Sequence, residues 1–453
     1  MYQIVNPATG LLVEEFPTAT DGQVSEAITR SDRAYRSWRD VPVEERALAV
    51  KRVGELFLER SEELAGIIAQ EMGKRIDEGR GEVQLSADIF TYYAESGPAL
   101  IADEQLDIRG GAALIQKRPV GPLIGIMPWN YPYYQVARFA APNLILGNTI
   151  LLKHAPNCPS SAAAIEQLLH DAGVPEDAYI NVYATNEQIA WMLADERIQG
   201  ISLTGSERAG SAVAAIAGRN LKKCVLELGG SDPLIVLDTT DLDKTVETVV
   251  NARMYNNGQA CNSPKRMIVL DDLYDNFIEK VTARVAHFKP GDPLDAETTL
   301  APLSSQRAAD ELVEQIQDAV DKGASLLMGG KHAEIPGAFV EPAVLTGVTQ
   351  EMRAYSEELF GPAIVIYRAA NEEEAIVLAN DSVYGLGASV FSADPARAQR
   401  VGDQLESGMV TLNTPPGSLP DLPFGGIKRS GIGRELGALG IEEFMNKRAV
   451  RLS

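Results

Sequence analysis

The chain has 453 residues, of which 45% are hydrophobic and 23% are charged, and its formal net charge is −22. This length suits two or three domains, and the composition is that of a globular protein rather than a disordered or fibrous one. The negative charge argues against a nucleic-acid surface, which needs clustered Lys and Arg, and no apolar run is long enough to predict a membrane span.

The cysteine and histidine content excludes two further classes of site. The three cysteines, Cys158, Cys224 and Cys261, are too few for a disulfide framework, and the four histidines have no metal-ligand spacing. The first residues lack a basic start followed by an apolar stretch, so no secretory signal is expected. We therefore predict a cytoplasmic protein without a metal site.

Helical patterning dominates the first hundred residues. The stretch 21–36 opens with a capping-type Thr20 and carries apolar residues at helical spacing, and 42–72 repeats that spacing. Short strands are then predicted at 106–108 and 113–116. They are joined across Gly110-Gly111, which is typical of a hairpin.

From Gly121 onward, strands alternate with helices. Strands are expected at 123–127, 149–152, 180–183, 200–203 and 225–228, and helices at 134–146, 160–172, 188–194 and 209–217. A second series of strands follows at 234–237, 267–270, 363–367, 388–391 and 410–413, and the piece 447–452 alternates like an exposed strand. This rhythm predicts an α/β fold with two mostly parallel sheets plus small outlying strands.

Cys261 follows the turn Asn256-Asn257-Gly258 and precedes Pro264. This placement favours an exposed, reactive thiol near a helix N-terminus, where backbone amides stabilise a thiolate. The alternative is a small buried apolar residue, which describes most free cysteines.

Two polar residues stand in settings that suit catalysis. Glu227 ends an apolar strand before Gly229 and Gly230, where partial burial would raise its pKa toward that of a general base. Asn130 is held between two prolines and two aromatics, which suits an oxyanion donor. The alternative for Glu227 is an ordinary solvated carboxylate at the end of a strand. The alternative for Asn130 is a side chain that hydrogen-bonds within its own turn.

The turn 203–210 ends a strand and opens a helix, so its backbone N–H groups suit a pyrophosphate. Its glycines, Gly205 and Gly210, do not form the G-x-G-x-x-G pattern, and glycines at such turns are common in any case.

Taken together, these strings resemble the aldehyde dehydrogenase superfamily from about residue 5 to the C-terminus. The matching strings, in order, are P-W-N-Y-P at Pro128, L-L-K at Leu151, L-T-G-S at Leu203, L-E-L-G-G at Leu226, N-x-G-Q-x-C ending at Cys261, E-E-x-F-G-P at Glu357 and P-F-G-G-x-K-x-S-G-x-G-R-E at Pro423. The resemblance implies two Rossmann-like α/β domains and a small β element for oligomerisation. It assigns 1–98 and 119–228 to the NAD(P)-binding domain, 229–430 to the catalytic domain, and 99–118 with 431–453 to a homodimer or homotetramer interface.

The resemblance also implies a mechanism. Cys261 would attack an aldehyde, the Asn130 amide and the Cys261 backbone N–H would hold the oxyanion, and Glu227 would activate the water that hydrolyses the thioester. Lys153 would bind the adenosine ribose, Ser206 the pyrophosphate, and Glu358 with Phe360 the nicotinamide end. The residues expected at the cofactor are Trp129, Lys153, Pro156, Gly205, Ser206, Glu358 and Phe360.

Pro156 departs from a common pattern of the family. An acidic residue often stands three positions after the cofactor lysine and favours NAD by accepting both ribose hydroxyls. Pro156 removes that carboxylate and its repulsion toward a 2′-phosphate, so we expect NADP to be accepted as well as NAD.

The substrate prediction depends mainly on Arg138. The string from Lys153 to Asn157, and Ser231-Asp232-Pro233, resemble the short bacterial succinate-semialdehyde dehydrogenases, in which a cation at the Arg138 position meets a substrate carboxylate. The alternative for Arg138 is a salt bridge on the helix surface. The residues expected at the substrate are Arg138, Tyr131, Ser418 and Phe424, with Tyr134 as a further candidate wall.

One alternative substrate assignment remains open, and three alternative functions are disfavoured. Tyr255 and Ser263 replace an arginine and a cysteine that some succinate-semialdehyde enzymes carry, so glutarate semialdehyde or a broad range of aldehydes remains an alternative. Glu227 argues against release of the thioester to coenzyme A. The lack of a histidine partner for Cys261 argues against a cysteine hydrolase, and the presence of Cys261, Glu227 and Asn130 together argues against a non-catalytic protein.

Overall fold

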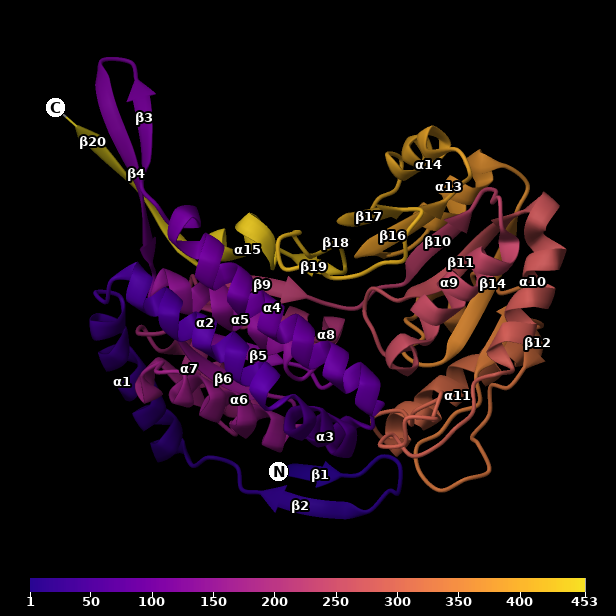
Figure 1. Cartoon of the computed structure of the whole chain (residues 1–453), viewed down its shortest axis with the longest axis horizontal. Coiled ribbons are helices and arrows are strands. Elements are labelled where there is room, and N and C mark those ends of the chain that lie inside the picture. Colours follow the sequence, from indigo (N-terminus) through magenta and orange to yellow (C-terminus); the bar gives the residue numbers. More distant parts are fainter. Residues whose placement is uncertain (453) are drawn as a thin grey trace.

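Two α/β units and a small projecting sheet make up the computed structural model, which describes residues 1–452 (Figure 1). The predicted α/β class with parallel sheets is confirmed. Across residues 1–452, no helix combines the length and the apolar character needed to cross a bilayer.

The first unit is built on a six-stranded sheet with the order β19-β9-β8-β5-β6-β7. Neighbouring strands from β9 to β7 are parallel, and β19 is antiparallel to β9. The strands are β5 (Pro122–Met127), β6 (Thr149–His154), β7 (Tyr179–Asn181), β8 (Gly200–Thr204), β9 (Lys223–Glu227) and β19 (Gly431–Ile432). All five strands expected between residues 123 and 228 are present, so the period of the apolar runs was a reliable guide.

Helices cover both faces of this sheet. The crossover helices are α5 (Tyr134–Leu146), α6 (Pro159–Asp171), α7 (Asn186–Ala194) and α8 (Glu207–Arg219), with the 3-10 turn η1 (Glu176–Ala178). The N-terminal helices are α1 (Asp21–Trp38), α2 (Val43–Glu59), α3 (Ser61–Met72) and α4 (Ile76–Leu100), and α15 (Gly437–Glu442) packs near α5. A hairpin of β1 (Tyr2–Val5) and β2 (Leu12–Phe16) precedes α1.

Two features of the N-terminal helices differ from the sequence prediction. The helical stretch expected over 42–72 is two helices, because Arg60 leaves helical geometry (φ −108°, ψ 22°) and ends α2. The 25-residue helix α4 was not among the predicted elements, since Gly79, Gly81 and Pro98 lie within it. Its buried face packs on α2, α3 and α5, and this packing overrides the low local propensity.

The second unit holds a seven-stranded sheet with the order β12-β13-β14-β11-β10-β16-β17, in which only β12 is antiparallel to its neighbour. The strands are β10 (Asp232–Val236), β11 (Pro264–Leu270), β12 (Ser325–Met328), β13 (Ala343–Thr346), β14 (Ala363–Ala369), β16 (Gly387–Phe391) and β17 (Met409–Leu412). The helices are α9 (Leu242–Met254), η2 (Tyr255–Gly258), α10 (Asp271–Val285), α11 (Gln306–Asp321), α12 (Arg353–Ser356), α13 (Glu372–Asn380) and α14 (Pro395–Gly402). A two-stranded pair, β15 (Tyr384–Gly385) and β18 (Ile427–Lys428), lies where the chain returns to the first unit.

The projecting sheet has the order β20-β4-β3 (Figure 1). It consists of β3 (Glu104–Ile108), β4 (Gly111–Pro119) and β20 (Met445–Leu452). Gly110 (φ 89°) and Gly111 (φ 148°) make the turn between β3 and β4, in backbone conformations that favour glycine. The expected hairpin is therefore present, and the C-terminal strand pairs with residues 112–119 of β4.

The segment 431–442 lies elsewhere than the predicted domain division places it. That division grouped 431–453 with the projecting hairpin, whereas β19 pairs with β9 in the six-stranded sheet and α15 packs near α5. The chain thus returns to the first unit before it enters β20.

Candidate functional site

Two cavities meet at Cys261, between the carboxyl ends of the first sheet and the second unit. The larger has a volume of about 560 Å³ and the smaller about 230 Å³. Of the residues that the structure describes, only Gln135 and Cys261 line both cavities. The thiol therefore stands where the contents of one cavity meet the contents of the other.

The loop that carries Cys261 has an unusual backbone. Asn256 (φ 50°), Asn257 (φ 54°) and Gly258 (φ 73°) are left-handed in succession, and Cys261 lies between this turn and β11. The expectation of a helix N-terminus at Cys261 was wrong. The left-handed residues stop η2 and Pro264 begins a strand, so no helix dipole points at the sulfur.

Arg253 at the end of α9 holds this loop from beneath. Its side chain is fully buried, and all of its donors bond to protein oxygens, most of them backbone carbonyls. The acceptors are Gly258 O (3.0 Å), Ser263 Oγ (2.8 Å), Leu359 O (2.8 Å), Gly361 O (2.7 Å) and Ala363 O (2.9 Å). One guanidinium thus fixes the cysteine loop to the segment that follows Glu358.

Lys265 ties the same two segments together on the side of the thiol. Its buried ammonium donates to Ala260 O (2.7 Å) and Cys261 O (2.6 Å), and its Nζ lies 2.9 Å from Oε1 of Glu358. Glu358 also accepts from the backbone N–H of Gly230 (3.2 Å). Cys261 and Glu358, which are expected to act as the nucleophile and at the cofactor, therefore share one cation.

Burial sets the state of the Cys261 thiol. Desolvation raises its pKa to about 12, although the charges of Arg138 and Lys265 act in the opposite direction. Glu227 and Glu358 raise the pKa further by repulsion. A pKa raised in this way disfavours the thiolate, so attack on a substrate requires a base to take the thiol proton.

Asn130 lies beside the thiol with its amide held in place. Its Nδ2 donates to the carbonyl of Gln259 (3.1 Å), which leaves one amide proton for a ligand. Its own carbonyl accepts from Lys74 Nζ (2.8 Å) and from Asn256 Nδ2 (3.0 Å). The turn therefore presents a preorganised donor next to Cys261, as an oxyanion site requires.

A buried ion pair supports this turn. Lys74 and Glu82, both with fully buried side chains, bond to each other. Glu82 also accepts from the backbone N–H groups of Tyr133 (2.8 Å) and Tyr134 (3.2 Å) at the start of α5. Its carboxylate thus caps the helix, and Lys74 joins that cap to the Asn130 carbonyl.

Glu227 ends β9 as an isolated acid. It is 2% exposed, and neither carboxyl oxygen has a hydrogen-bond partner among the described residues. Burial raises its pKa well above the ordinary value, against the lowering effect of Arg138. The desolvation expected from the sequence is present, and such an acid has the properties of a general base held ready for a water molecule.

The smaller cavity has the chemistry of a nicotinamide site. Trp129 and Phe360 stand edge to face across it, with ring centroids 5.6 Å apart. Glu358 reaches toward Gly229, where a Cβ would lie only 2.5 Å from its carboxylate, so glycine is needed there. Seven predicted residues line this cavity, namely Trp129, Asn130, Gly205, Ser206, Cys261, Glu358 and Phe360.

Gly205 and Ser206 stand at the N-terminus of α8. The hydroxyl of Ser206 accepts from the backbone N–H of Ala209 (3.3 Å) and so caps the helix. The remaining N–H groups of this first turn suit a phosphate. The residues present therefore fit a pyridine dinucleotide.

Lys153 and Pro156 lie apart from that cavity, after β6. Lys153 is 8% exposed, burial lowers its pKa, and the described residues give its ammonium no hydrogen bond or ion pair. Pro156 is exposed beside the N-terminal strand, where its carbonyl accepts from Gln3 N (3.0 Å). A buried ammonium without a hydrogen-bond or ion-pair partner suits a hydroxyl-rich or anionic ligand.

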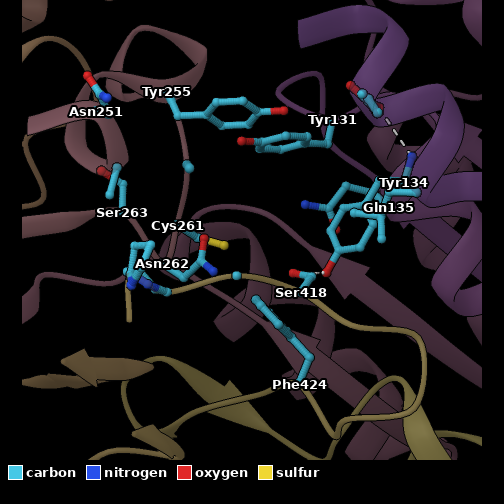
Figure 2. Close-up of a pocket in the computed structure, with 18 of the residues that line it drawn as sticks. Tyr131, Tyr134, Gln135, Asn251, Tyr255, Cys261, Asn262, Ser263, Ser418 and Phe424 are labelled. Carbon is cyan, nitrogen blue, oxygen red and sulfur yellow. Dashed lines mark hydrogen bonds between the residues drawn. The ribbon is translucent and has the colours of Figure 1, made fainter. Parts of the chain in front are cut away.

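The larger cavity brings the predicted substrate residues together with the thiol (Figure 2). Tyr131, Tyr134, Ser418 and Phe424 all line it with Cys261. The hydroxyl of Tyr134 donates to Ser418 Oγ (2.8 Å), which leaves the serine proton free for a ligand in the cavity.

Arg138 differs from its predicted placement. Its guanidinium is 1% exposed, lies outside the set of cavity-lining residues, and forms an ion pair with Glu435. It also donates to Tyr134 Oη (3.2 Å) and to Thr204 Oγ1 (3.0 Å). In this structure the guanidinium therefore pairs with the Glu435 carboxylate instead of facing the cavity as predicted. The alternative prediction of a surface salt bridge is also wrong, because this pair is buried.

Several site residues escaped the sequence reasoning. Asn256 and Glu435 stand inside strings quoted from the sequence but were given no role there. The residues that escaped altogether are Lys74, Glu82, Gln135, Arg253 and Lys265. Gln135 and Lys265 could have been suspected, since each stands four or five positions after a predicted catalytic residue. The others meet the site only through contacts between distant segments, which local patterns do not report.

Known proteins resemble this chain over nearly its whole length. The model of the "Aldehyde dehydrogenase family" matches residues 1–450. The succinate-semialdehyde dehydrogenase (NADP(+)) of Deinococcus radiodurans is 54% identical over 450 residues, which cover 99% of this chain and 94% of the relative. The enzyme of that name, numbered 1, from Mycobacterium tuberculosis is 41% identical over 449 residues, covering 98% of each.

A solved structure gives the same picture. The succinic semialdehyde dehydrogenase of Streptococcus pyogenes, solved in complex with NADP+, superimposes with a TM-score of 0.98 at 42% identity and covers both chains in full.

Proposed function

Since the chain belongs to the aldehyde dehydrogenase family, we propose that it oxidises succinate semialdehyde to succinate with NADP as the preferred cofactor. The observation that carries this proposal is the position of Cys261 between two cavities. One has aromatic and helix-terminal groups that fit a nicotinamide nucleotide, and the other ends in a hydrogen-bonded hydroxyl pair.

The first half of the reaction is an addition to Cys261. The thiol passes its proton to a water molecule, which acts as the base, and the sulfur bonds to the aldehyde carbon while the carbonyl electrons move to the oxygen. The free amide proton of Asn130 and the backbone N–H of Cys261 hold that oxyanion. The bound cofactor supplies the acceptor for the hydride that then leaves this carbon, and a thioester remains on Cys261.

The second half is hydrolysis of the thioester. Glu227, in its carboxylate form, takes a proton from a water molecule, whose oxygen attacks the thioester carbon. The bond to sulfur breaks, and the acid is released. The support for Glu227 is its burial without any partner for either oxygen, because a base that is not engaged elsewhere can accept that proton.

The substrate carboxylate is recognised through a chain of hydrogen bonds that starts at Arg138. Arg138 donates to the Tyr134 oxygen, Tyr134 donates to Ser418, and the Ser418 proton points onward to the substrate. Each donor polarises the next, so the buried charge acts on the cavity without entering it. The guanidinium also stacks over the rings of Tyr134 and Phe424, which fixes its place.

The preference for NADP is supported at the adenosine end. Pro156 presents no carboxylate to repel a 2′-phosphate, and the Lys153 ammonium, which lies over the Tyr2 ring, has no hydrogen-bond or ion-pair partner among the described residues. NAD would lose only the attraction of that phosphate, so it should still be used at a lower kcat/KM.

The test compares succinate semialdehyde with butanal, which has the same four-carbon chain without a carboxylate, and with glutarate semialdehyde. Initial rates of NADPH formation are measured for the wild type, Tyr134→Phe and Ser418→Ala. We expect succinate semialdehyde to have the highest kcat/KM, and both variants to lower it about tenfold or more while butanal changes little. Tyr179→Phe serves as the control, because that buried hydroxyl has no partner in the described structure.

Two results would overturn the substrate proposal. Equal kcat/KM for butanal and succinate semialdehyde would make the enzyme a general aldehyde dehydrogenase. A higher kcat/KM for glutarate semialdehyde would move the carboxylate one methylene further from Cys261.

We also propose that the enzyme is a homodimer or homotetramer. The support is the projecting sheet, in which β3 and β20 both present an edge to solvent. Sedimentation at several concentrations tests this, and a monomer throughout would contradict it. The cytoplasm is the proposed location, supported by three cysteines that are all free.

A further inference from the structure

Gln135 is a buried polar side chain that no protein group satisfies. It is 1% exposed, and neither its Nε2 nor its Oε1 has a hydrogen-bond partner among the described residues. A buried amide without partners costs free energy, and native structures retain such groups where a ligand, an ordered water or a catalytic role accounts for them.

The position of Gln135 tells which ligand this is. Among the described residues, only Gln135 and Cys261 line both cavities. Figure 2 shows the two side chains around the same cavity, Gln135 from the first turn of α5 and Cys261 from the loop before β11. A group at that junction lies next to whatever is bonded to the sulfur.

The substrate offers two polar ends, and only one belongs at the junction. The aldehyde oxygen is two bonds from the sulfur after addition, whereas the carboxylate oxygens are five bonds away, toward Tyr134 and Ser418 in the wall of the larger cavity. A neutral amide that borders the thiol therefore meets the oxygen. An amide N–H is the donor that a developing negative oxygen requires.

We propose that Gln135 is a catalytic residue whose Nε2 donates a hydrogen bond to the substrate oxygen as Cys261 adds to the carbonyl carbon. It would share the oxyanion with the Asn130 amide, from the opposite end of the turn that joins Asn130 to α5. The proposal rests on the aldehyde oxidation described above, and it does not depend on which aldehyde is the natural one.

The experiment replaces the amide by an apolar group of similar length. Gln135→Met is compared with wild type for kcat/KM toward succinate semialdehyde and toward butanal, for NADP binding by fluorescence, and for alkylation of Cys261 by iodoacetamide. Alkylation forms no oxyanion, so it reports the thiol without the proposed contact. Gln84→Met makes the same change on the exposed surface of α4 and is the control.

We expect Gln135→Met to lower kcat/KM about 10- to 100-fold for both aldehydes by the same factor, because Asn130 remains as a second donor. NADP binding and the alkylation rate should stay within about twofold of wild type. Gln135→Leu should give a similar loss. Leucine also lacks the amide but differs from methionine in shape, so an equal effect of both variants points to the amide.

Three outcomes would overturn the proposal. A loss confined to succinate semialdehyde would place Gln135 at the carboxylate, and weaker NADP binding would place it at the nicotinamide. A parallel fall in the alkylation rate would mean that Gln135 only shapes the thiol. The wild-type preference between the two aldehydes tests the proposed substrate separately, so the two failures are distinguishable.

Discussion

Lys265 and Glu358 form a buried ion pair, 2.9 Å from Nζ to Oε1, and the same ammonium bonds the carbonyl of Cys261. Two residues of the smaller cavity, Glu358 and Cys261, are thereby held by one side chain from β11. This arrangement links the geometry of cofactor binding to that of the thiol.

Loss of the Lys265 charge should make the thiol harder to ionise. The charge lowers the pKa of Cys261, so Lys265→Met should raise that pKa further and move the pH profile of iodoacetamide alkylation toward higher pH. At a fixed pH below that pKa, the alkylation rate should fall in proportion to the thiolate fraction, because the thiolate is the nucleophile. The KM for NADP should also rise, because Glu358 loses its partner. An unchanged alkylation profile would contradict this role, and Lys280→Met on the surface of α10 is the control.

Glu227→Gln should separate the two halves of the reaction. The variant should still release a burst of NADPH of about one per active site, while steady-state turnover falls about 100-fold or more, since water is no longer activated. Stopped-flow absorbance measures both phases, with Glu187→Gln, at an exposed position of α7, as the control. A variant with no burst would show that Glu227 is needed before the thioester forms.

The pH dependence of turnover should follow Glu227 in the wild type. Burial raises the pKa of this carboxyl, so its base form accumulates only as the pH rises. Where hydrolysis limits turnover, kcat should therefore increase with pH through that raised pKa, and it should lose this slope in Glu227→Gln. A wild-type kcat that falls over the same range would contradict the assignment.

Arg253→Met should destabilise the protein strongly. The change leaves the carbonyls of Gly258, Leu359, Gly361 and Ala363 without their donor in a buried place. The free energy of unfolding should fall by at least about 3 kcal/mol, measured in urea at fixed protein concentration. Arg219→Met at the exposed end of α8 should change it by less than about 0.5 kcal/mol. Equal stability of the two variants would mean that water replaces the guanidinium.

Pro156→Glu should reverse the cofactor preference. A carboxylate at this position would repel the 2′-phosphate, so kcat/KM for NADP should fall about tenfold or more relative to that for NAD. Rates with both cofactors give this ratio. Pro395→Glu, at the exposed start of α14, should leave it unchanged. A ratio that stays at the wild-type value in Pro156→Glu would place the phosphate elsewhere.

The regular elements were predictable where local signals agree with the packing. The helix over 134–146 has the predicted bounds, because Gly147 (φ 101°) ends it in the left-handed conformation. The hairpin at Gly110-Gly111 likewise follows from turn chemistry. Helix α4 was not predictable in this way, since its glycines and Pro98 are compensated only by tertiary contacts.

The sequence predicted which motif residues belong to the site, but not the ion pairs and the burial that set their charge states. Strings around Asn130, Glu227 and Cys261 pointed to side chains that the fold does bring to the same region. The pairing of Arg138 with Glu435 joins residues almost 300 positions apart, and no local pattern announces it. The same holds for the burial that raises the thiol pKa, because desolvation is a property of the assembled fold.

The narrow overlap of the two cavities has a kinetic consequence. Because only Gln135 and Cys261 belong to both walls in the described structure, an acid formed on the sulfur has its own space to leave by while the reduced nucleotide is still bound. Product inhibition by the acid should therefore be uncompetitive or noncompetitive with respect to NADP rather than competitive. The order in which the acid and the reduced nucleotide depart is then set by their separate affinities, because neither blocks the exit of the other.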